Sequence, residues 1–260
     1  MLVAGIDIGA ATAKAVIFNN GNMVGSSVIP TGASVARAAE EVAKLVREQA
    51  GIWDKFDYIV STGYGRNNVP FKDKAVSEIL CHGKGAHALF PDVRTIVDIG
   101  GQDSKVIGLD DNGIVASFVM NDKCAAGTGR FFEVMTSVLE IGYVEEFGPL
   151  ALNSNNPADI SSTCTIFAES EVVSLRAEGR PVEDLLAGII VAVVHRVVVM
   201  GKQVGYRPHI AFTGGVAKNV GVKKYLEKEI GLEIFVPPEP QIIGAFGAAL
   251  IARDELRKQG

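Results

Sequence analysis

Residues 97–130 read VDIGGQDSKVIGLDDNGIVASFVMNDKCAAGTGR. The stretch opens as an apolar strand, bends through two glycines just after Asp98, and continues as an alternating strand over residues 104–109. A polar turn at residues 110–113 then sends the chain back as a third strand. Small residues at such a bend let backbone N–H groups approach phosphate oxygens, and the carboxylate can hold Mg²⁺ directly or through its waters. The stretch therefore predicts a phosphate-binding hairpin.

The same stretch ends in a turn that carries a cysteine. Residues 121–130 place Cys124 among glycines and alanines, where a helix is expected to begin. Cys164 stands in a similar context, because a helical pattern follows residues 160–165. Aligned backbone dipoles at a helix N-terminus stabilise a thiolate or an anionic cluster. We expect phosphate and thiolate chemistry to be coupled here; the alternative for each cysteine is a small buried side chain.

The first twenty residues repeat the central motif. Residues 7–14, DIGAATAK, align with residues 98–105, DIGGQDSK, so that Asp, Ile, Gly and Lys coincide without a gap. Each copy soon reaches a turn that ends in Asn-Gly, at Gly21 and Gly113. One Asp-x-Gly turn would be weak evidence, because such turns are common. Two in the same context predict a duplicated fold with phosphate-binding hairpins that face each other.

Hydrophobic periodicity outlines the other elements. The apolar helix 181–202 is expected to be buried on nearly all sides, and the last helix, which is rich in small residues, should pack against residues 83–86. Residues 152–162 are predicted to be a loop. Residues 62–66 are predicted to be either a plain surface turn or a turn that binds a ligand or a partner. The predicted strands are 23–29, 56–61, 209–212 and 233–236, and the predicted helices are 33–49, 77–86, 131–139, 181–202, 220–230 and one opening at 244.

Composition indicates a soluble, cytoplasmic globular protein. The chain has 260 residues, of which 48% are hydrophobic and 21% are charged. A net charge of −5 and a pI near 5.5 argue against a surface for nucleic acid or for an anionic membrane. The N-terminus lacks the basic segment of a signal peptide, and the longest apolar run, 185–194, is too short to span a bilayer.

Motif searches exclude several other classes of site. The three cysteines form no CxxC pair, which excludes zinc ribbons, thioredoxin-like motifs and ferredoxin runs. Because the number of cysteines is odd and a reducing compartment is expected, we do not expect structural disulfides. There is no GxxxxGK[ST] loop, no GxGxxG after the first strand, no GxSxG and no HExxH. Cys81 is assigned to the core, and His195 and Arg196 are assigned structural roles.

The order of these motifs resembles the superfamily of actin, sugar kinases and heat-shock chaperone ATPases. Within it, the chain resembles the ATP-dependent reductive activators of 2-hydroxyacyl-CoA dehydratases, a family shared with the ATPase subunits of benzoyl-CoA reductase and with reductases of double-cubane proteins. The motifs that carry the resemblance are TGYGR (62–66), SEILCHGKGA (77–86), DIGGQDSK (98–105), NDKCAAGTGR (121–130), ISSTC (160–164), FAESEV (167–172) and TGGVAKN (213–219).

The resemblance implies an α/β fold of two duplicated halves around a nucleotide cleft. The first half would be 1–95, completed by the C-terminal helix 244–260, and the second, 96–243, would carry the cluster cysteines. Asp98, Gln102 and Glu78 are the implied catalytic residues, with Glu78 at the position that orients the attacking water in some members. The implied cofactor-binding residues are Asp7, Gly9, Thr12, Ala13 and Lys14 in the first hairpin, Gly100, Gly101, Asp103 and Lys105 in the second, and Gly214, Gly215, Lys218 and Asn219 in an adenosine-binding turn.

One departure from the family pattern concerns the first hairpin. The family usually carries hydroxyl residues at the positions that are Ala10, Ala11 and Ala13 here, which leaves Thr12. The two aspartates of the hairpins would organise Mg²⁺, and ATP or ADP would lie between them.

The resemblance also implies that Cys124 and Cys164 hold one [4Fe–4S] cluster per homodimer. The number of cysteines fits this arrangement, because a cubane needs four thiolates and two cysteines per chain supply four when a two-fold axis doubles them. The implied activity is ATP hydrolysis coupled to low-potential electron transfer. The implied partners are an iron–sulfur acyl-CoA dehydratase, a benzoyl-CoA reductase or a double-cubane protein downstream, and a ferredoxin or flavodoxin upstream. The alternatives are a small-molecule kinase with buried cysteines and a non-catalytic, actin-like scaffold.

Overall fold

The computed structural model describes residues 1–122, 124–161 and 165–259. The chain forms two compact units, each built around one five-stranded sheet. The first unit comprises Met1–Ile96, Leu109–Ala116 and Pro237–Gly260, and the second comprises Val97–Gly108 and Ser117–Val236. Each unit therefore contains one of the two Asp-x-Gly hairpins.

The first unit has strand order β3-β2-β1-β4-β5. β1 pairs antiparallel with β2 and parallel with β4, which places Asp7 opposite Lys14 on one side and opposite Thr62 on the other. The β2–β3 turn uses Asn20 and Gly21, both with positive φ, as a tight hairpin turn requires. The elements are β1 Leu2–Ile8, β2 Thr12–Asn19, β3 Asn22–Pro30, α1 Val35–Ala50, β4 Tyr58–Thr62, η1 Arg66–Asn68, β5 Lys74–Ala75, α2 Glu78–Leu89, η4 Pro240–Ile242 and α8 Ile243–Gln259.

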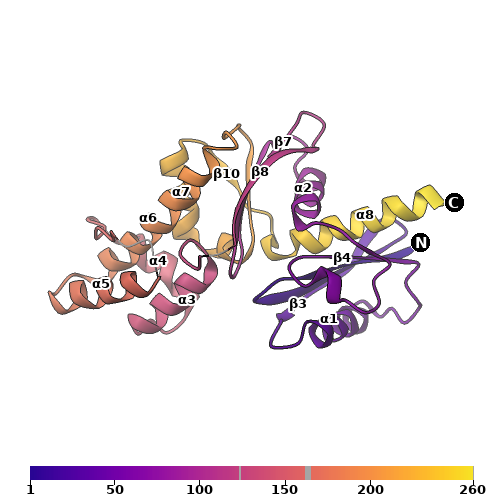
Figure 1. Ribbon diagram of the computed structural model, residues 1–260, viewed down its shortest axis with the longest axis horizontal. Helices are drawn as coiled ribbons and strands as arrows, with labels where there is room; N and C mark the ends of the chain where they lie inside the picture. Colours follow the sequence, from indigo (N-terminus) through magenta and orange to yellow (C-terminus); the bar gives the residue numbers. More distant parts are fainter. Residues whose placement is uncertain (123, 162–164, 260) are drawn as a thin grey trace. The chain divides into compact units, whose positions relative to one another are not determined.

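Helices cover both faces of this sheet, as Figure 1 shows for α1 and α8. Ser34 caps α1 by accepting a hydrogen bond from the Arg37 N–H, and Gly51 ends the helix in the left-handed conformation. On the other face, Gly5 of β1 has no side chain where the α8 backbone at Ala245 and Ala249 passes. Successive strand residues alternate between the two cores, so the continuous apolar run of β1 serves both.

The predicted contact between the last helix and residues 83–86 is present, with one difference. Gly247 of α8 lies against the carbonyl of Cys81, and Gly85 of α2 lies against the carbonyl of Ile243. Gly83 instead faces Val115, at the tip of the β7–β8 hairpin. Only glycine fits at the two helix crossings, because a Cβ would collide with backbone.

The second unit has strand order β10-β9-β6-β7-β8. Its core gathers residues of β6, β7 and β9 with helices α3, α4, α6 and α7. The elements are β6 Thr95–Ile99, β7 Ser104–Leu109, β8 Val115–Asn121, α3 Gly129–Val138, η2 Val144–Glu146, α4 Phe147–Ala151, α5 Thr165–Ala177, α6 Val182–Gly201, β9 Ile210–Thr213, η3 Gly215–Lys218, α7 Val220–Ile230 and β10 Ile234–Phe235.

The apolar helix α6 is less enclosed than its sequence predicts. By length and composition alone, it is long and apolar enough to cross a membrane. However, 61% of its apolar 18-residue stretch is buried inside the protein. Val191, His195 and Val199 form an exposed stripe at four-residue spacing, and His195 pairs with Glu229. The helix therefore buries one broad face, as a core helix does, and the prediction of burial on nearly all sides is wrong.

Candidate nucleotide site and cysteine turn

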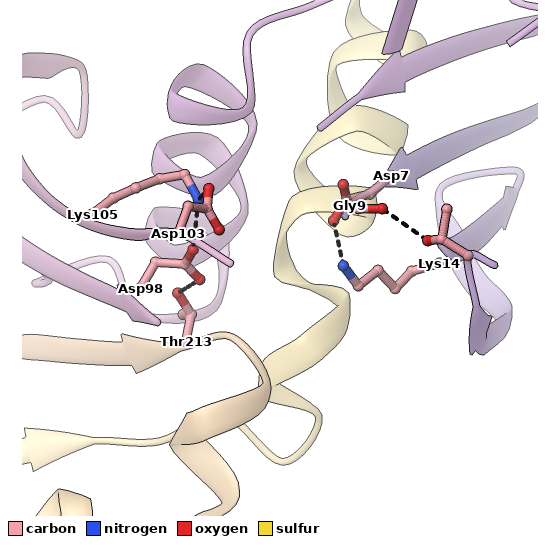
Figure 2. Close-up of polar contacts among 8 residues, drawn as sticks. Asp7, Gly9, Lys14, Asp98, Asp103, Lys105 and Thr213 are labelled. Atoms are coloured by element: carbon pink, nitrogen blue, oxygen red, sulfur yellow. Dashed lines mark hydrogen bonds and ion pairs between the residues drawn. The ribbon is translucent and has the colours of Figure 1, made fainter. Parts of the chain in front are cut away.

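The first hairpin holds an aspartate and a lysine on paired strands. The Nζ of Lys14 lies 3.3 Å from Oδ2 of Asp7, and both side chains are largely buried. In the turn, the Gly9 N–H donates to the Thr12 carbonyl, and the Thr31 hydroxyl donates to the Gly9 carbonyl at 2.8 Å (Figure 2). A Cβ on Gly9 would stand 3.1 Å from the Lys14 ammonium, so glycine at the bend keeps a side chain away from that cation.

Two glycines distant in sequence keep the surroundings of Asp7 clear. Gly63, with φ of +84°, lies against Oδ1 of Asp7, and a Cβ on Gly244 would stand 2.9 Å from Oδ2. The turn at residues 62–66 is fixed in place because the Gly65 N–H donates to the Ile8 carbonyl, and Arg66 donates to the Gly63 carbonyl. This turn therefore forms part of the wall around Asp7.

Helix α2 brings further charge to the same region. Glu78 lies in its first turn, and Cys81 follows one turn later, fully buried. Burial raises the pKa of the Cys81 thiol to about 12, and the negative charges of Asp7 and Glu78 add to the rise, while the neighbouring Thr62 hydroxyl opposes it. The thiol therefore stays protonated at neutral pH, which fits the predicted core role of Cys81.

The second hairpin repeats the geometry of the first but is more enclosed. The Gly100 N–H donates to the Asp103 carbonyl, at the same position as the Gly9–Thr12 bond. Lys105 lies 3.1 Å from Oδ2 of Asp98 and 2.5 Å from Oδ2 of Asp103, and its side chain is only 2% exposed. The two carboxylates hold this ammonium within the hairpin (Figure 2).

Asp98 has partners on both oxygens. Its Oδ1 accepts a hydrogen bond from the Thr213 hydroxyl at 2.7 Å, while its Oδ2 faces Lys105. Gly214, with φ of +87°, lies against the Ile99 carbonyl, and a Cβ on it would stand 3.0 Å from Oδ1 of Asp98. These contacts hold the Asp98 carboxylate in one orientation. Thr213 was not among the predicted site residues, although it directly precedes the predicted glycine turn.

The other predicted residues of the second unit are more dispersed. Gln102 is exposed at the bend of the hairpin, and Gly215 and Lys218 belong to η3. The Asn219 side chain caps α7 by accepting from the Val222 N–H at 3.1 Å. The structure therefore brings Gly214 to Asp98 and gives Asn219 a structural role, and adenosine binding by this turn stays a prediction.

The cysteine turn is attached to the second hairpin by its backbone. Gly129 and Arg130, the first two residues of α3, donate their N–H groups to the carbonyls of Gly100 and Gly101, both at 2.8 Å. The turn itself is closed by the Thr128 hydroxyl and N–H, which both donate to the Ala125 carbonyl. Two N–H groups that have no partner within their own helix thus bind the second hairpin.

Cys124 is half-buried within this turn, and the Asn121 side chain donates to its carbonyl at 2.9 Å. It lies ahead of α3, whose N-cap is Thr128, so the helix dipole acts on Cys124 from outside the first turn. Cys164, the other predicted cluster ligand, lies outside the described residues. Among the described residues, no group of three or more His, Cys, Asp or Glu could hold a metal ion.

A protein-family model supplies the deciding comparison. The model of the BadF/BadG/BcrA/BcrD ATPase family matches residues 4–252, nearly the whole chain. The chain belongs to this family. One relative is the 2-hydroxyisocaproyl-CoA dehydratase activator of Clostridioides difficile, which is 44% identical over 259 residues, covering 99% of this chain and 97% of that one. A subunit of the benzoyl-CoA reductase of Thauera aromatica is 30% identical over 261 residues, covering 96% and 92%.

The solved structures of a dehydratase activator and of a sugar kinase agree with the fold. The activator of the 2-hydroxyisocaproyl-CoA dehydratase from Clostridium difficile with bound ADPNP matches with a TM-score of 0.94 over 100% of this chain and 97% of that one, at 44% identity. A ROK family glucokinase from Streptomyces griseus matches with a TM-score of 0.60 at 12% identity, over 98% and 100%. These matches confirm the predicted family and the actin- and sugar-kinase-like α/β fold.

The residues of the two hairpins fit Mg²⁺ and a nucleotide. Each hairpin offers a buried carboxylate beside a bend of glycine, and each carboxylate already has a lysine next to it. Oxygen ligands suit Mg²⁺, and a bend of glycine lets phosphate oxygens approach the backbone closely. The described part of the chain offers one accessible thiol for a cluster, Cys124, which fits a cluster that takes its other ligands from Cys164 and from a second copy.

Proposed function

We propose that this chain couples ATP hydrolysis to the transfer of one low-potential electron, from a [4Fe–4S] cluster shared by two copies to a partner iron–sulfur enzyme. The observation that supports coupling most directly is the pair of hydrogen bonds from Gly129 and Arg130 to Gly100 and Gly101. Through them, the bend that would face phosphate and the helix that follows Cys124 share one backbone network.

The hydrolytic step would be catalysed by positioning of the reactants and by electrostatic stabilisation, without a covalent intermediate. Asp7 and Asp98 would hold Mg²⁺ through its waters, and Lys14 would neutralise phosphate charge at the open bend of the first hairpin. Lys105 is enclosed by carboxylates, so its role would be to hold Asp98. Glu78 and Gln102 would orient the water that attacks the γ-phosphorus, and the P–O bond to the ADP oxygen breaks as the new bond forms.

Electron transfer would use the cysteines of both copies. Cys124 and Cys164 from each chain would supply the four thiolates, and a homodimer follows from that count. The bound cluster supplies one-electron chemistry at low potential. The relatives' names support an acyl-CoA dehydratase or a benzoyl-CoA reductase as the acceptor. A double-cubane protein as another acceptor, and a ferredoxin or flavodoxin as donor in the cytoplasm, are what the sequence resemblance implies. The net charge of −5 supports neither nucleic acid nor an anionic membrane as partner.

The test is an anaerobic purification. We expect a brown homodimer with about four irons and four sulfides per dimer, Mg²⁺-dependent ATP hydrolysis, and an electron paramagnetic resonance signal after reduction. A colourless protein that phosphorylates a small molecule would support the kinase alternative and contradict the proposal.

A further inference from the structure

His82 is a buried histidine that the proposed mechanism does not use. It lies on α2, one helical turn after Glu78, so the two side chains share a face of the helix. Its side chain is buried, with a residue exposure of 6%. A buried imidazole needs hydrogen-bond partners, because it carries one donor and one acceptor when neutral. What lies beside its ring nitrogens therefore decides its role.

The surroundings of Gly244 place His82 next to Asp7. A Cβ on Gly244 would stand 3.0 Å from Nε2 of His82 and 2.9 Å from Oδ2 of Asp7. Both polar atoms thus border the same small space, which exists because α8 has no side chain at this position. Gly244 lies in the first turn of a helix with ordinary backbone angles, so its φ does not require glycine. The space that it leaves, rather than its flexibility, is the feature that matters.

The Asp7 carboxylate also has neighbours on its other sides. Gly63 lies against Oδ1, and Lys14 lies 3.3 Å from Oδ2. The first hairpin therefore fixes one side of the carboxylate through its own lysine, as the second hairpin does for Asp98. Asp98 has, in addition, a hydroxyl donor from a second strand, at Thr213. In the first unit, the imidazole of His82 offers Asp7 a second donor from outside the hairpin in the same way.

We propose that His82 is a positioning residue for Asp7. Its Nε2–H faces Oδ2 across the space at Gly244 and holds the carboxylate, directly or through one water, in the orientation that binds the hydrated Mg²⁺. The inference rests on the proposed Mg²⁺ role of Asp7. Outer partners of metal-ligating groups are worth about 10–100-fold in metal affinity or activity, which sets the expected size of the effect.

The first experiment measures ATP hydrolysis by the full-length dimer against Mg²⁺ concentration. In His82→Leu, which keeps volume but loses the donor, we expect half-saturation by Mg²⁺ to rise roughly tenfold, with a comparable fall in kcat and a smaller change in the KM for ATP. His82→Gln keeps an N–H near the Nε2 position and should restore most of the loss. His87→Leu is the matched control, because His87 lies on the same helix but against Gly113. This substitution should leave the Mg²⁺ half-saturation, kcat and KM unchanged.

Gly244→Ala tests the same contact from the other side. The added methyl group would enter the space between His82 and Asp7, while alanine favours the helix. We expect the Mg²⁺ dependence of this variant to resemble that of His82→Leu, with thermal stability close to that of the wild type. Agreement between two variants on different helices would separate positioning of Asp7 from general damage to α2.

The second experiment does not depend on activity. The chain has four histidines, so ¹⁵N-labelled histidine gives a simple spectrum in which His82 is assigned by its loss in His82→Gln. Asp7→Asn should shift the Nε2 resonance of His82 and leave those of His87, His195 and His209 unchanged. This result is readable even if the protein proves to have no cluster or no ATPase activity, so it separates failure of this inference from failure of the proposed function.

Two results would overturn the proposal. One is a His82 resonance that does not respond to Asp7→Asn. The other is a folded His82→Leu protein whose Mg²⁺ half-saturation equals that of the wild type. If His82→Leu does not fold, His82→Asn replaces it, since its amide reaches only the Nδ1 position; equal Mg²⁺ dependence in His82→Asn and His82→Gln would then contradict a role for Nε2.

Discussion

The proposed coupling between nucleotide and cluster can be tested at one backbone hydrogen bond. Gly129→Pro removes the N–H that donates to the Gly100 carbonyl. The backbone tolerates the change, because proline is favoured at the first position of a helix, and the preceding Thr128 has φ of −132° and ψ of 171°, in the extended region that precedes proline. The ring carbon on nitrogen would also displace the Gly100 carbonyl, so that the second hairpin is detached from α3 at this point.

The matched control is Gly129→Ala. Alanine keeps the N–H, and its Cβ would stand 3.2 Å from the Gly100 oxygen and 3.3 Å from the Gly101 Cα. Such contacts are tight but require a shift of only a few tenths of an ångström. The control therefore retains both hydrogen bonds, whereas Gly129→Pro retains only the bond from Arg130 to Gly101.

The expected size follows from the energy of the lost bond. A net hydrogen bond is worth about 0.5–1.5 kcal/mol, and allosteric coupling energies are typically ~1–3 kcal/mol. For a one-electron centre, ~1.4 kcal/mol corresponds to ~60 mV. If the two bonds carry the coupling, Gly129→Pro should reduce the nucleotide-dependent shift in cluster potential by roughly 20–60 mV, and the redox dependence of the ATP/ADP affinity ratio by about 2- to 12-fold.

The assay compares cluster potential and nucleotide affinity in both states. Potentiometric titration with an ATP analogue and with ADP gives the shift, and reciprocity requires the same energy in the affinities of the oxidised and reduced protein. Chelation of cluster iron should be faster with the ATP analogue than with ADP in the wild type and Gly129→Ala, but similar in Gly129→Pro. A folded Gly129→Pro protein with undiminished coupling would refute this route and favour transmission along β7 and β8.

Four further predictions concern the separate parts of the chain. Asp98→Asn should lower ATP hydrolysis by at least ~10²-fold with the cluster retained, and equal activity would place the phosphate site elsewhere. Cys124→Ser or Cys164→Ser should lose iron, brown colour and much of the dimer, whereas Cys81→Ser should keep all three; an iron content that depends on Cys81 would contradict the bridging model. Folding raises the pKa of the Cys81 thiol from 9.0 to about 12, so the folded state holds this proton more tightly than the unfolded state. The contribution of this thiol to the free energy of unfolding is therefore complete below about pH 9 and is lost as pH rises towards 12. Urea unfolding of the wild type and Cys81→Ser across this pH range will measure the loss. Gly247→Ala should destabilise the first unit by ~1–3 kcal/mol or more, measured by thermal unfolding, because its Cβ meets the Cys81 carbonyl; a wild-type melting temperature would be inconsistent with this crossing.

The hairpins could be predicted from sequence because their signals are local. The strand at 104–109 coincides with β7, and the Asp-to-Lys spacing of the repeat places each lysine opposite its aspartate across the turn. The enclosure of Lys105 was not foreseen, because it depends on Asp103 folding back beside Asp98. Local pattern thus predicts which residues meet in a hairpin, but not which of them remain exposed.

Contacts between distant segments account for most of what sequence reasoning missed. Gly63 and Gly244 lie against the Asp7 carboxylate from two other segments of the chain. Because glycine has no side chain, nothing in the sequence indicates that these two residues contact Asp7. The short helix α4, Phe147–Ala151, was also missed, since Gly148 and Pro149 read as helix breakers. Proline is tolerated in a first turn, and Phe147 packs edge-on against Phe132 at 5.2 Å, which stabilises the helix by tertiary contact.

The crossing of α8 over β1 also governs the order in which this protein can fold on the ribosome. β1 precedes α8 by most of the length of both units, yet one of its faces is covered by Ala245 and Ala249 of that helix. Until α8 emerges, that face of the sheet stays open to water and to other nascent chains. The first unit should therefore complete its folding after the second has been synthesised, and its early strands are the natural targets for a chaperone during translation.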